Sequence, residues 1–248
     1  MMTELVLVEG VSDVQLISYY LQNVYEWNYE KTNALGITVL DKYEYIENLS
    51  KGENQLVICG VGGNGKFSSF VEKHRINNMI IEKDIASLMV VTDRDEDSDI
   101  KIGKRINKAL EKITIQSGKW TSNEMTDLFG QKKTVNTFLL IIPAGEYGAL
   151  ERVIIKALED IPEEKELIKY VIGFIDNLKG EIVPELKQTN KSSKATVGTF
   201  FSVRYPQNAM RSFGTFVSKI DWSKSDSLKI LFMPFRFLGL DKPIDEYI

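Results

Sequence analysis

Two short apolar segments that each end in acidic residues constrain the fold of this chain more than any other feature. They are Leu5–Val8, followed by Glu9, Gly10 and Asp13, and Leu88–Thr92, followed by Asp93 and Asp95. Apolar runs of this length are typical of strands buried on both faces of a parallel sheet. Because ligands bind outside the carboxyl ends of parallel strands, we expect these acids to lie around one point.

The rest of the chain alternates apolar runs with helical periodicity. We expect strands at residues 4–8, 37–40, 55–59, 87–92 and 137–142, and helices at 13–25, 66–75, 77–83, 100–115 and 148–158. This alternation predicts an α/β fold with a mainly parallel sheet flanked by helices. We expect residues 1–160 to form a metal-binding core. Residues 161–248 are expected to form a mostly helical extension packed on it as one compact unit.

Aromatic residues are frequent in the expected extension. Those considered are Phe200, Phe201, Tyr205, Phe213, Phe216 and Trp222. We expect them to fill a hydrophobic core; a base-stacking surface is the alternative. Leu228–Phe232 is expected to add a late edge element to the sheet.

Composition excludes several classes of site. Among 248 residues there is one cysteine, Cys59, and one histidine, His74, so an internal disulfide and a zinc site of Cys and His ligands are excluded. We expect a buried Cys59 thiol and a solvent-exposed His74. No apolar stretch is long enough to span a bilayer, and we expect a cytoplasmic protein with no membrane partner. The net charge of −4 argues against nucleic-acid binding over the whole surface but allows a local basic track.

A glycine-rich segment follows the expected strand at residues 55–59. Gly60–Lys66 fits the phosphate-loop pattern, but Phe67 stands where that loop requires a Ser or Thr hydroxyl to hold magnesium. A P-loop-like nucleotide-binding protein using Gly60–Lys66 is therefore one alternative. A second reading is a simple turn between strand and helix. In a third, the loop amides and Lys66 bind a phosphate of a different substrate.

The acids also have structural explanations. Asp13 is suited to capping the start of a helix, and Asp95 to a solvated acidic loop. Asp93 and Asp95 share a face only if the chain stays extended between them. Asp93 directly follows an apolar strand, so it is desolvated and needs a partner.

The order of these motifs resembles the Toprim domain of bacterial primases, topoisomerases, maturase ribonucleases and OLD-family nucleases. The resemblance rests on a strand followed by Glu9-Gly10 and Asp13, then a strand followed by Asp93 and Asp95, and it covers residues 3–160. The fold implied is Rossmann-like. Stand-alone relatives carry a glycine-rich turn like the one at Gly62, Gly63 and Lys66.

Two further segments are similar to the stand-alone, OLD-like branch, and the nearest group is the uncharacterised DUF3226 family. Gly148–Glu151 resembles the element in which a later acid joins the site. Lys194-Ala195 before an aromatic helix resembles a Lys-Ala segment of these proteins. An exposed helical acid and a solvated lysine are the structural alternatives for Glu151 and Lys194.

The resemblance implies metal-dependent phosphodiester chemistry on DNA or RNA. It implies one or two Mg²⁺ or Mn²⁺ ions held by Glu9, Asp13, Asp93, Asp95 and Glu151, with Glu9 and Lys194 as catalytic residues and Gly62, Gly63 and Lys66 as phosphate-binding residues. A separate ATPase or another protein is an expected partner, and the chain is expected to be able to form oligomers. A non-catalytic Toprim-like module that binds nucleic acid or protein is the remaining alternative.

Five basic residues follow the second acidic cluster, Lys101, Lys104, Arg105, Lys108 and Lys112, and three lysines come later, Lys187, Lys191 and Lys194. Both groups either track phosphates or form solvated helix faces, and for the first group we favour the solvated face.

Overall fold

The chain divides into two compact units. The structure, a computed structural model, describes residues 2–239. Within that range, residues 2–92, 97–141 and 234–239 form one unit, the sheet unit, and residues 93–96 and 142–233 form the other, the helical unit. The division therefore falls near residue 142, before the boundary expected at residue 160.

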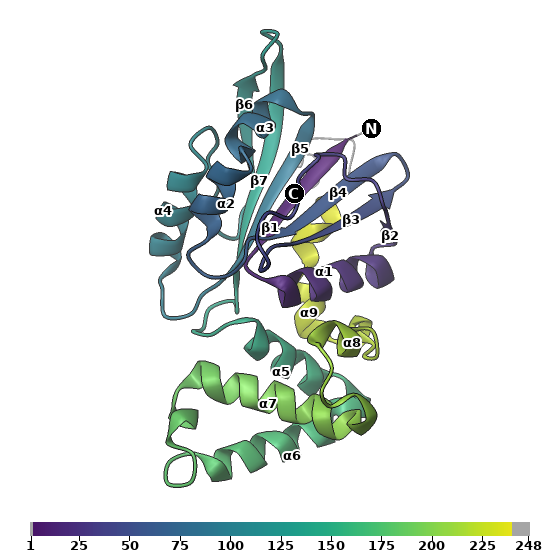
Figure 1. The fold of residues 1–248 in the computed structure, drawn as a ribbon, viewed down its shortest axis with the longest axis vertical. Coiled ribbons are helices and arrows are strands. Elements are labelled where there is room, and N and C mark those ends of the chain that lie inside the picture. The colour runs from purple at the N-terminus through teal and green to yellow at the C-terminus, as the bar shows by residue number, and fades with distance from the viewer. Residues whose placement is uncertain (1, 240–248) are drawn as a thin grey trace. The chain divides into compact units, whose positions relative to one another are not determined.

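The sheet unit is built on seven strands in the order β2-β3-β4-β1-β5-β7-β6 (Figure 1). Their bounds are β1 Thr3–Val8, β2 Asn28–Tyr29, β3 Tyr45–Lys51, β4 Asn54–Gly60, β5 Ile85–Asp93, β6 Thr121–Thr126 and β7 Lys132–Ile142. β1 pairs in parallel with both β4 and β5. β2–β3, β3–β4 and β6–β7 are antiparallel pairs. The predicted α/β class and mostly parallel sheet are confirmed, and the antiparallel strands β2, β3 and β6 were not predicted.

Helices cover both faces of this sheet. They are α1 Val11–Val24, α2 Phe67–Lys73, α3 Ile76–Glu82 and α4 Asp99–Ala109. Leu5 and Leu7 of β1 belong to one buried cluster with residues of α2, α3 and α4. α1 is not part of that cluster and contacts β3 and β4. All six residues of β1 are buried, as a strand covered on both faces requires.

Three expectations about secondary structure are wrong. Residues 37–40 form no strand. Ile37 is buried but Leu40 is 57% exposed, so the apolar side chains of this run are not buried together as those of a core strand would be. The helix expected to reach residue 115 ends at Ala109, where the Asn107 side chain hydrogen-bonds both backbone groups of Ile115 and holds a loop. Leu228–Phe232 adds no strand, since residues 226–231 form a helix that the Ser225 side chain caps.

Cys59 and His74, for which no functional role was expected, differ in how well their predicted burial agrees with the structure. Cys59 is fully buried, as predicted, and burial raises the pKa of its thiol. His74 is wrongly predicted as exposed: it is 9% exposed, its ring lies 4.2 Å from that of Phe70, and its Nε2 is 3.2 Å from a Glu44 carboxylate oxygen. Lys73 binds the other oxygen of Glu44 at 3.0 Å. A buried carboxylate with two cationic or polar neighbours accounts for this arrangement without a catalytic role.

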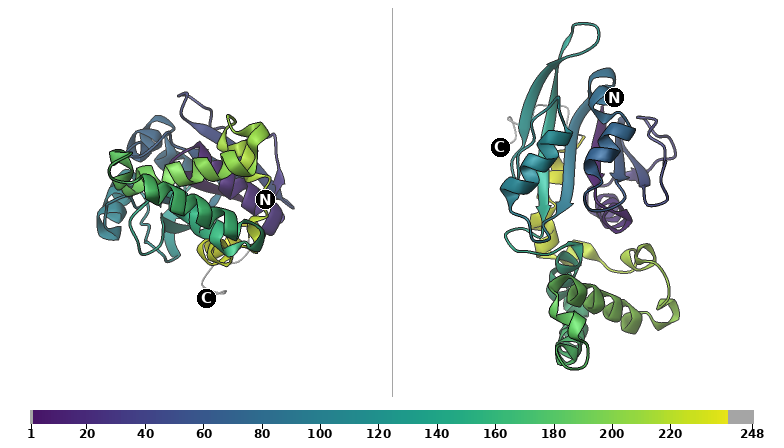
Figure 2. Two further views of the ribbon diagram at one scale, coloured as in Figure 1. Left: turned by 90° about the horizontal axis from the view of Figure 1, so that it is seen from below. Right: turned by 60° about the vertical axis from the view of Figure 1, so that its left-hand side comes forward.

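The helical unit contains α5 to α9. Their bounds are α5 Leu150–Asp160, α6 Pro162–Leu178, α7 Thr189–Arg204, α8 Phe213–Val217 and α9 Asp226–Leu231, with short 3-10 turns at Pro184–Lys187, Pro206–Asn208 and Trp222–Lys224. α5, α6 and α7 contact one another (Figure 2). None of the helices described in residues 2–239 is long and apolar enough to cross a membrane.

Four of the six aromatic residues expected in a core are buried, namely Phe200, Phe201, Phe216 and Trp222, while Tyr205 and Phe213 are partly exposed. Phe200, Phe201 and Trp222 are at most 2% exposed. The ring of Phe216 stacks on that of Phe201 with 4.9 Å between centroids, and Tyr205 stacks on Phe216 at 6.1 Å. Ring faces that already stack on one another in this way are not available to stack on nucleobases.

Candidate functional site

The first acidic cluster lies in the sheet unit, where β1 ends. Glu9 directly follows the strand and is 6% exposed. Its Oε1 accepts a hydrogen bond of 2.6 Å from the hydroxyl of Thr92 near the end of β5. A carboxylate removed from water needs such a donor, and a short bond to a hydroxyl is a strong one.

Asp13 has the structural role that its sequence position suggested. Its Oδ2 accepts a hydrogen bond of 2.9 Å from the backbone amide of Gly10, the residue that caps α1. A Cβ on Gly60 would lie 3.2 Å from the carbonyl carbon and oxygen of Gly10. Gly60 is therefore required for the end of β4 to approach the turn between β1 and α1 this closely.

The glycine-rich loop after β4 also uses backbone amides for hydrogen bonds within the protein. The amides of Gly62 and Gly63 both donate to the backbone carbonyl of Glu9, at 3.1 and 2.7 Å. Lys66 is exposed, and Phe67 is 2% exposed at the start of α2, which has only seven residues. A phosphate loop presents its amides to the ligand; here two of them serve to join the loop to β1, which disfavours the P-loop alternative.

The second acidic cluster lies in the helical unit, just after β5. Asp93 Oδ1 accepts a hydrogen bond of 3.0 Å from the amide of Leu150, the first residue of α5. A carboxylate at a helix N-terminus is stabilised by the exposed amides and the helix dipole. Asp93, which is partly exposed, is therefore hydrogen-bonded to the start of the helix that carries Glu151 in its first turn.

Asp95 lies in a backbone conformation that its residue type tolerates. Its φ is +47°, in the left-handed region that Asp, Asn and Gly adopt most readily. Its amide donates to the carbonyl of Gly148 at 2.7 Å, and the Gly148 amide donates back at 3.0 Å. The chain thus leaves the extended conformation after Asp93, and the condition under which Asp93 and Asp95 would share one strand face is not met.

Gly148 is the second glycine with a structural requirement. Its φ is +142°, and a Cβ there would lie 2.4 Å from Cδ of Arg152. The pairing of Asp95 with residue 148 therefore depends on the absence of a side chain.

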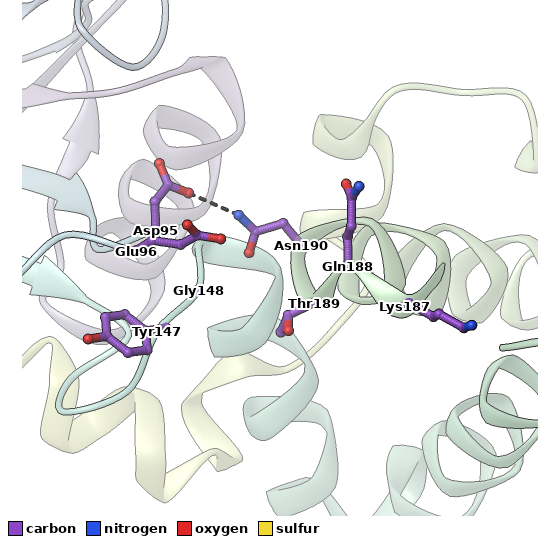
Figure 3. Close-up of a pocket in the computed structure, with 8 residues that line it drawn as sticks. All are labelled: Asp95, Glu96, Tyr147, Gly148, Lys187, Gln188, Thr189 and Asn190. Carbon is purple, nitrogen blue, oxygen red and sulfur yellow. Dashed lines mark hydrogen bonds between the residues drawn. The ribbon is translucent and has the colours of Figure 1, made fainter. Parts of the chain in front are cut away.

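A cavity of about 580 Å³ opens beside Asp95, and we call it the Asp95 cavity. Its lining is Asp95, Glu96, Tyr147, Gly148, Lys187, Gln188, Thr189 and Asn190 (Figure 3). Nδ2 of Asn190, at the start of α7, donates to Asp95 Oδ1 at 3.1 Å, as the dashed line in Figure 3 shows. The cavity therefore combines two carboxylates, one lysine and several neutral polar groups in one place.

Lys194 lies on α7 four residues after Asn190 and is exposed. Residues four apart lie on the same face of a helix. Lys194 is thus on the helix face that Asn190 presents toward Asp95, while its charge remains in water.

The basic residues on α4 support the solvated interpretation. Asp97 binds Lys101 at 2.5 Å and Arg105 at 3.4 Å. Two of the five basic residues are therefore already neutralised by a neighbouring acid.

The donor groups near Asp95 suit a hard cation only in part. Within residues 2–239, no group of three or more His, Cys, Asp and Glu side chains is arranged to hold a metal ion. Asp95 and Glu96 supply carboxylate oxygens, the ligands that Mg²⁺ prefers, and Mg²⁺ commonly binds through one or two carboxylates plus substrate phosphates and water. The residues fit a magnesium ion that arrives with a phosphate-bearing substrate.

The sequence analysis missed the contribution of α7 and the turn before it. Lys187 was expected only as one of three later lysines that could track phosphates, and no site was expected at Thr189 or Asn190, yet all three residues line the Asp95 cavity. Pro184 and the polar residues before an apolar helical period are signals of a helix start. No local signal shows that this helix start lies next to Asp95, 95 residues earlier in the chain.

Comparison with known proteins gives one family and one solved structure. The model of DUF3226, described as a protein of unknown function, matches residues 3–232. The crystal structure of a hypothetical protein from Pyrococcus horikoshii OT3 is similar at 15% identity with a TM-score of 0.47, covering 94% of this chain and 99% of that one. No curated protein matches.

Proposed function

The chain belongs to the DUF3226 family, and we propose that it is a Toprim-like, divalent-metal-dependent phosphodiesterase that acts on nucleic acid. The observation that carries the proposal is the Asp95 cavity, which Asp95 and Glu96 line together with Lys187 and the start of α7. Asp95 and Glu96 come soon after the end of β5 in the sequence. The resemblance takes metal ligands from this position. Oxygen ligands and a phosphate-binding cation in one cavity are what such chemistry requires.

The residues of the cavity have distinct proposed roles. A bound Mg²⁺ or Mn²⁺ would polarise a phosphoryl oxygen and lower the pKa of an attacking water. Asp95 and Glu96 would hold the ion, and Asn190 would orient the Asp95 carboxylate through its 3.1 Å hydrogen bond. Lys187 and Lys194 place positive charge near the phosphate, where charge accumulates in the transition state.

The other predicted metal ligands are Asp93, Glu151, Glu9 and Asp13. Asp93 fixes the start of α5 through the amide of Leu150 and so positions Glu151, the next residue. Glu9 and Asp13 keep their predicted roles in metal binding and catalysis as hypotheses to be tested by substitution. Nucleic acid is the proposed partner because its phosphodiester groups are attracted to a solvent-open cavity that bears a lysine, Lys187.

The test is cleavage of labelled single- and double-stranded DNA and RNA by the full chain with Mg²⁺ or Mn²⁺. Asp95→Asn is the decisive variant, because Asn tolerates the same left-handed backbone and removes only the charge. Asp226→Asn is the matched control, since the Asp226 side chain is 84% exposed and binds only Lys229 among the ion pairs of the described residues. We expect metal-dependent cleavage that Asp95→Asn abolishes and Asp226→Asn preserves.

Two results would refute the proposal: absence of cleavage of every substrate, or equal cleavage by wild type and Asp95→Asn. Binding of nucleic acid without cleavage would instead support the non-catalytic module.

A further inference from the structure

A second cavity in the helical unit lies between α5, α6 and α7 and has a volume of about 410 Å³. It shares no lining residue with the Asp95 cavity. We call it the α5–α7 cavity. Its size is within the range of small-molecule sites and far above that needed for one water molecule.

Polar groups without partners are buried in its wall. Ser192 and Ser193 line the cavity from α7 and are 8% and 7% exposed. Among the residues that the structure describes, no hydrogen bond is made by either hydroxyl. Nε of Arg152, on α5, is also buried and has no partner among the described residues. Buried polar atoms in native structures nearly always bind a partner, so Arg152 Nε points to a ligand, and the two serines line the same cavity as further possible donors.

The chemistry of these groups selects the ligand. Arg152 Nε can only donate a hydrogen bond, and each serine hydroxyl has a proton to donate. Lys156, one helical turn after Arg152, adds a positive charge to the same wall. A convergence of donors with cationic side chains is matched by a ligand rich in acceptor oxygens, such as a phosphate group.

The acids of the cavity do not oppose this reading. Glu146 is bound to Arg152, and Asp176 is bound to Lys179 at 2.5 Å. The third acid, Glu159, is exposed to solvent. Two acids and two cations of the lining are therefore paired with each other, and Lys156 and Glu159 are both exposed to solvent. The unpartnered buried atom that remains, Arg152 Nε, is a donor.

From this geometry we infer that the α5–α7 cavity binds a phosphomonoester, with Ser192, Ser193, Arg152 and Lys156 holding the phosphate. The remaining volume accommodates the organic group to which the phosphate is attached. Two sources supply this chemistry: a free nucleotide and the phosphorylated end of a nucleic-acid strand. The inference does not depend on the catalytic proposal, because binding alone tests it.

The experiment is calorimetric titration of the full chain with inorganic phosphate, a nucleoside 5′-monophosphate, the same nucleoside without phosphate, and a short oligonucleotide with and without a 5′-phosphate. We expect saturable binding of inorganic phosphate and of the nucleotide but not of the nucleoside, and for the oligonucleotide an additional binding step only when it carries the 5′-phosphate. Tighter binding of the nucleotide identifies a free small molecule as the source, and tighter binding of the phosphorylated oligonucleotide identifies a strand end.

Matched variants locate the binding. Ser193→Ala should weaken binding about tenfold, equivalent to roughly 1.4 kcal/mol, and Ser202→Ala, on the same helix but outside the cavity, should leave it unchanged. Lys156→Met should also weaken it, and Lys191→Met, an exposed lysine of α7, should not. Failure of phosphate and nucleotide to bind at millimolar concentration, or equal binding by both members of each pair, would overturn the inference.

Discussion

Glu4 offers the sharpest quantitative test of how the sheet unit is stabilised. Its side chain is buried in β1 at 1% exposure. Burial raises the pKa of Glu4 from 4.5 to about 7, partly offset by hydrogen bonds from the amide of Gly239 and from Ser87. Its Oε2 has no hydrogen-bond partner among the described residues. The folded chain therefore keeps a proton on Glu4 at pH values where the unfolded chain has lost it.

The sign and size of the effect follow by linkage. Between pH 4.5 and about 7 the unfolded state binds fewer protons, so the free energy of unfolding falls as the pH rises. Each unit of pKa shift corresponds to about 1.4 kcal/mol, so the full contribution is on the order of 3 kcal/mol. Below pH 4.5 this stabilisation is complete, and above pH 7 it is lost.

Glu4→Gln removes the titration and keeps an oxygen that accepts from the Gly239 amide, a bond of 3.1 Å in the native chain. We expect the variant to gain about 3 kcal/mol relative to wild type between pH 4.5 and 7.5, measured by urea unfolding across that range. Glu72→Gln, on the exposed side of α2, is the control and should differ from wild type by a constant amount. A Glu4→Gln difference that does not change with pH would refute the argument.

Three further changes have defined outcomes. Gly148→Ala places a Cβ 2.4 Å from Cδ of Arg152 at a φ of +142° and should lower the free energy of unfolding by about 1–3 kcal/mol in urea; an unchanged midpoint would contradict the required glycine. Asp13→Ala removes the cap of α1 and should cost about 1 kcal/mol in the same assay, and a cost near zero would show that the cap is dispensable. Lys66→Ala should leave nucleotide binding, measured by calorimetry, unchanged, because Gly62 and Gly63 donate to the protein; loss of binding would restore the P-loop alternative.

Much of the central fold could be predicted because strands that are buried on both faces appear in the sequence as short, continuous apolar runs. Each apolar run near β1, β4 and β5 is long enough to identify a buried strand; Glu9 and Asp93 mark the ends of the first and last runs, and glycines mark the end of the run in β4. The strand β3 and the edge strand β6 were missed because neither contains an apolar run: most side chains of β3 are partly exposed, and those of β6 alternate between partly exposed and exposed. Pairing with a neighbouring strand, not sequence pattern, determines such strands.

Only the acidic residues of the candidate site could be predicted from the sequence. Asp93 and Asp95 are marked by their position after a strand. Asn190 and Lys187 are polar residues in a polar segment, and only the tertiary fold brings them to the Asp95 cavity. The left-handed conformation of Asp95 likewise results from its pairing with Gly148, 53 residues later in sequence. Long-range contacts of this kind leave no local signal.

The central claim is that Asp95 holds a catalytic divalent cation. The most direct measurement is a crystal structure of the full chain soaked with Mn²⁺ and a non-cleavable oligonucleotide, in which anomalous scattering locates the ion. The account predicts an anomalous peak in direct contact with the Asp95 carboxylate and with a phosphate oxygen, and no such peak in Asp95→Asn. A manganese ion bound elsewhere, or an unchanged peak in the variant, would contradict it.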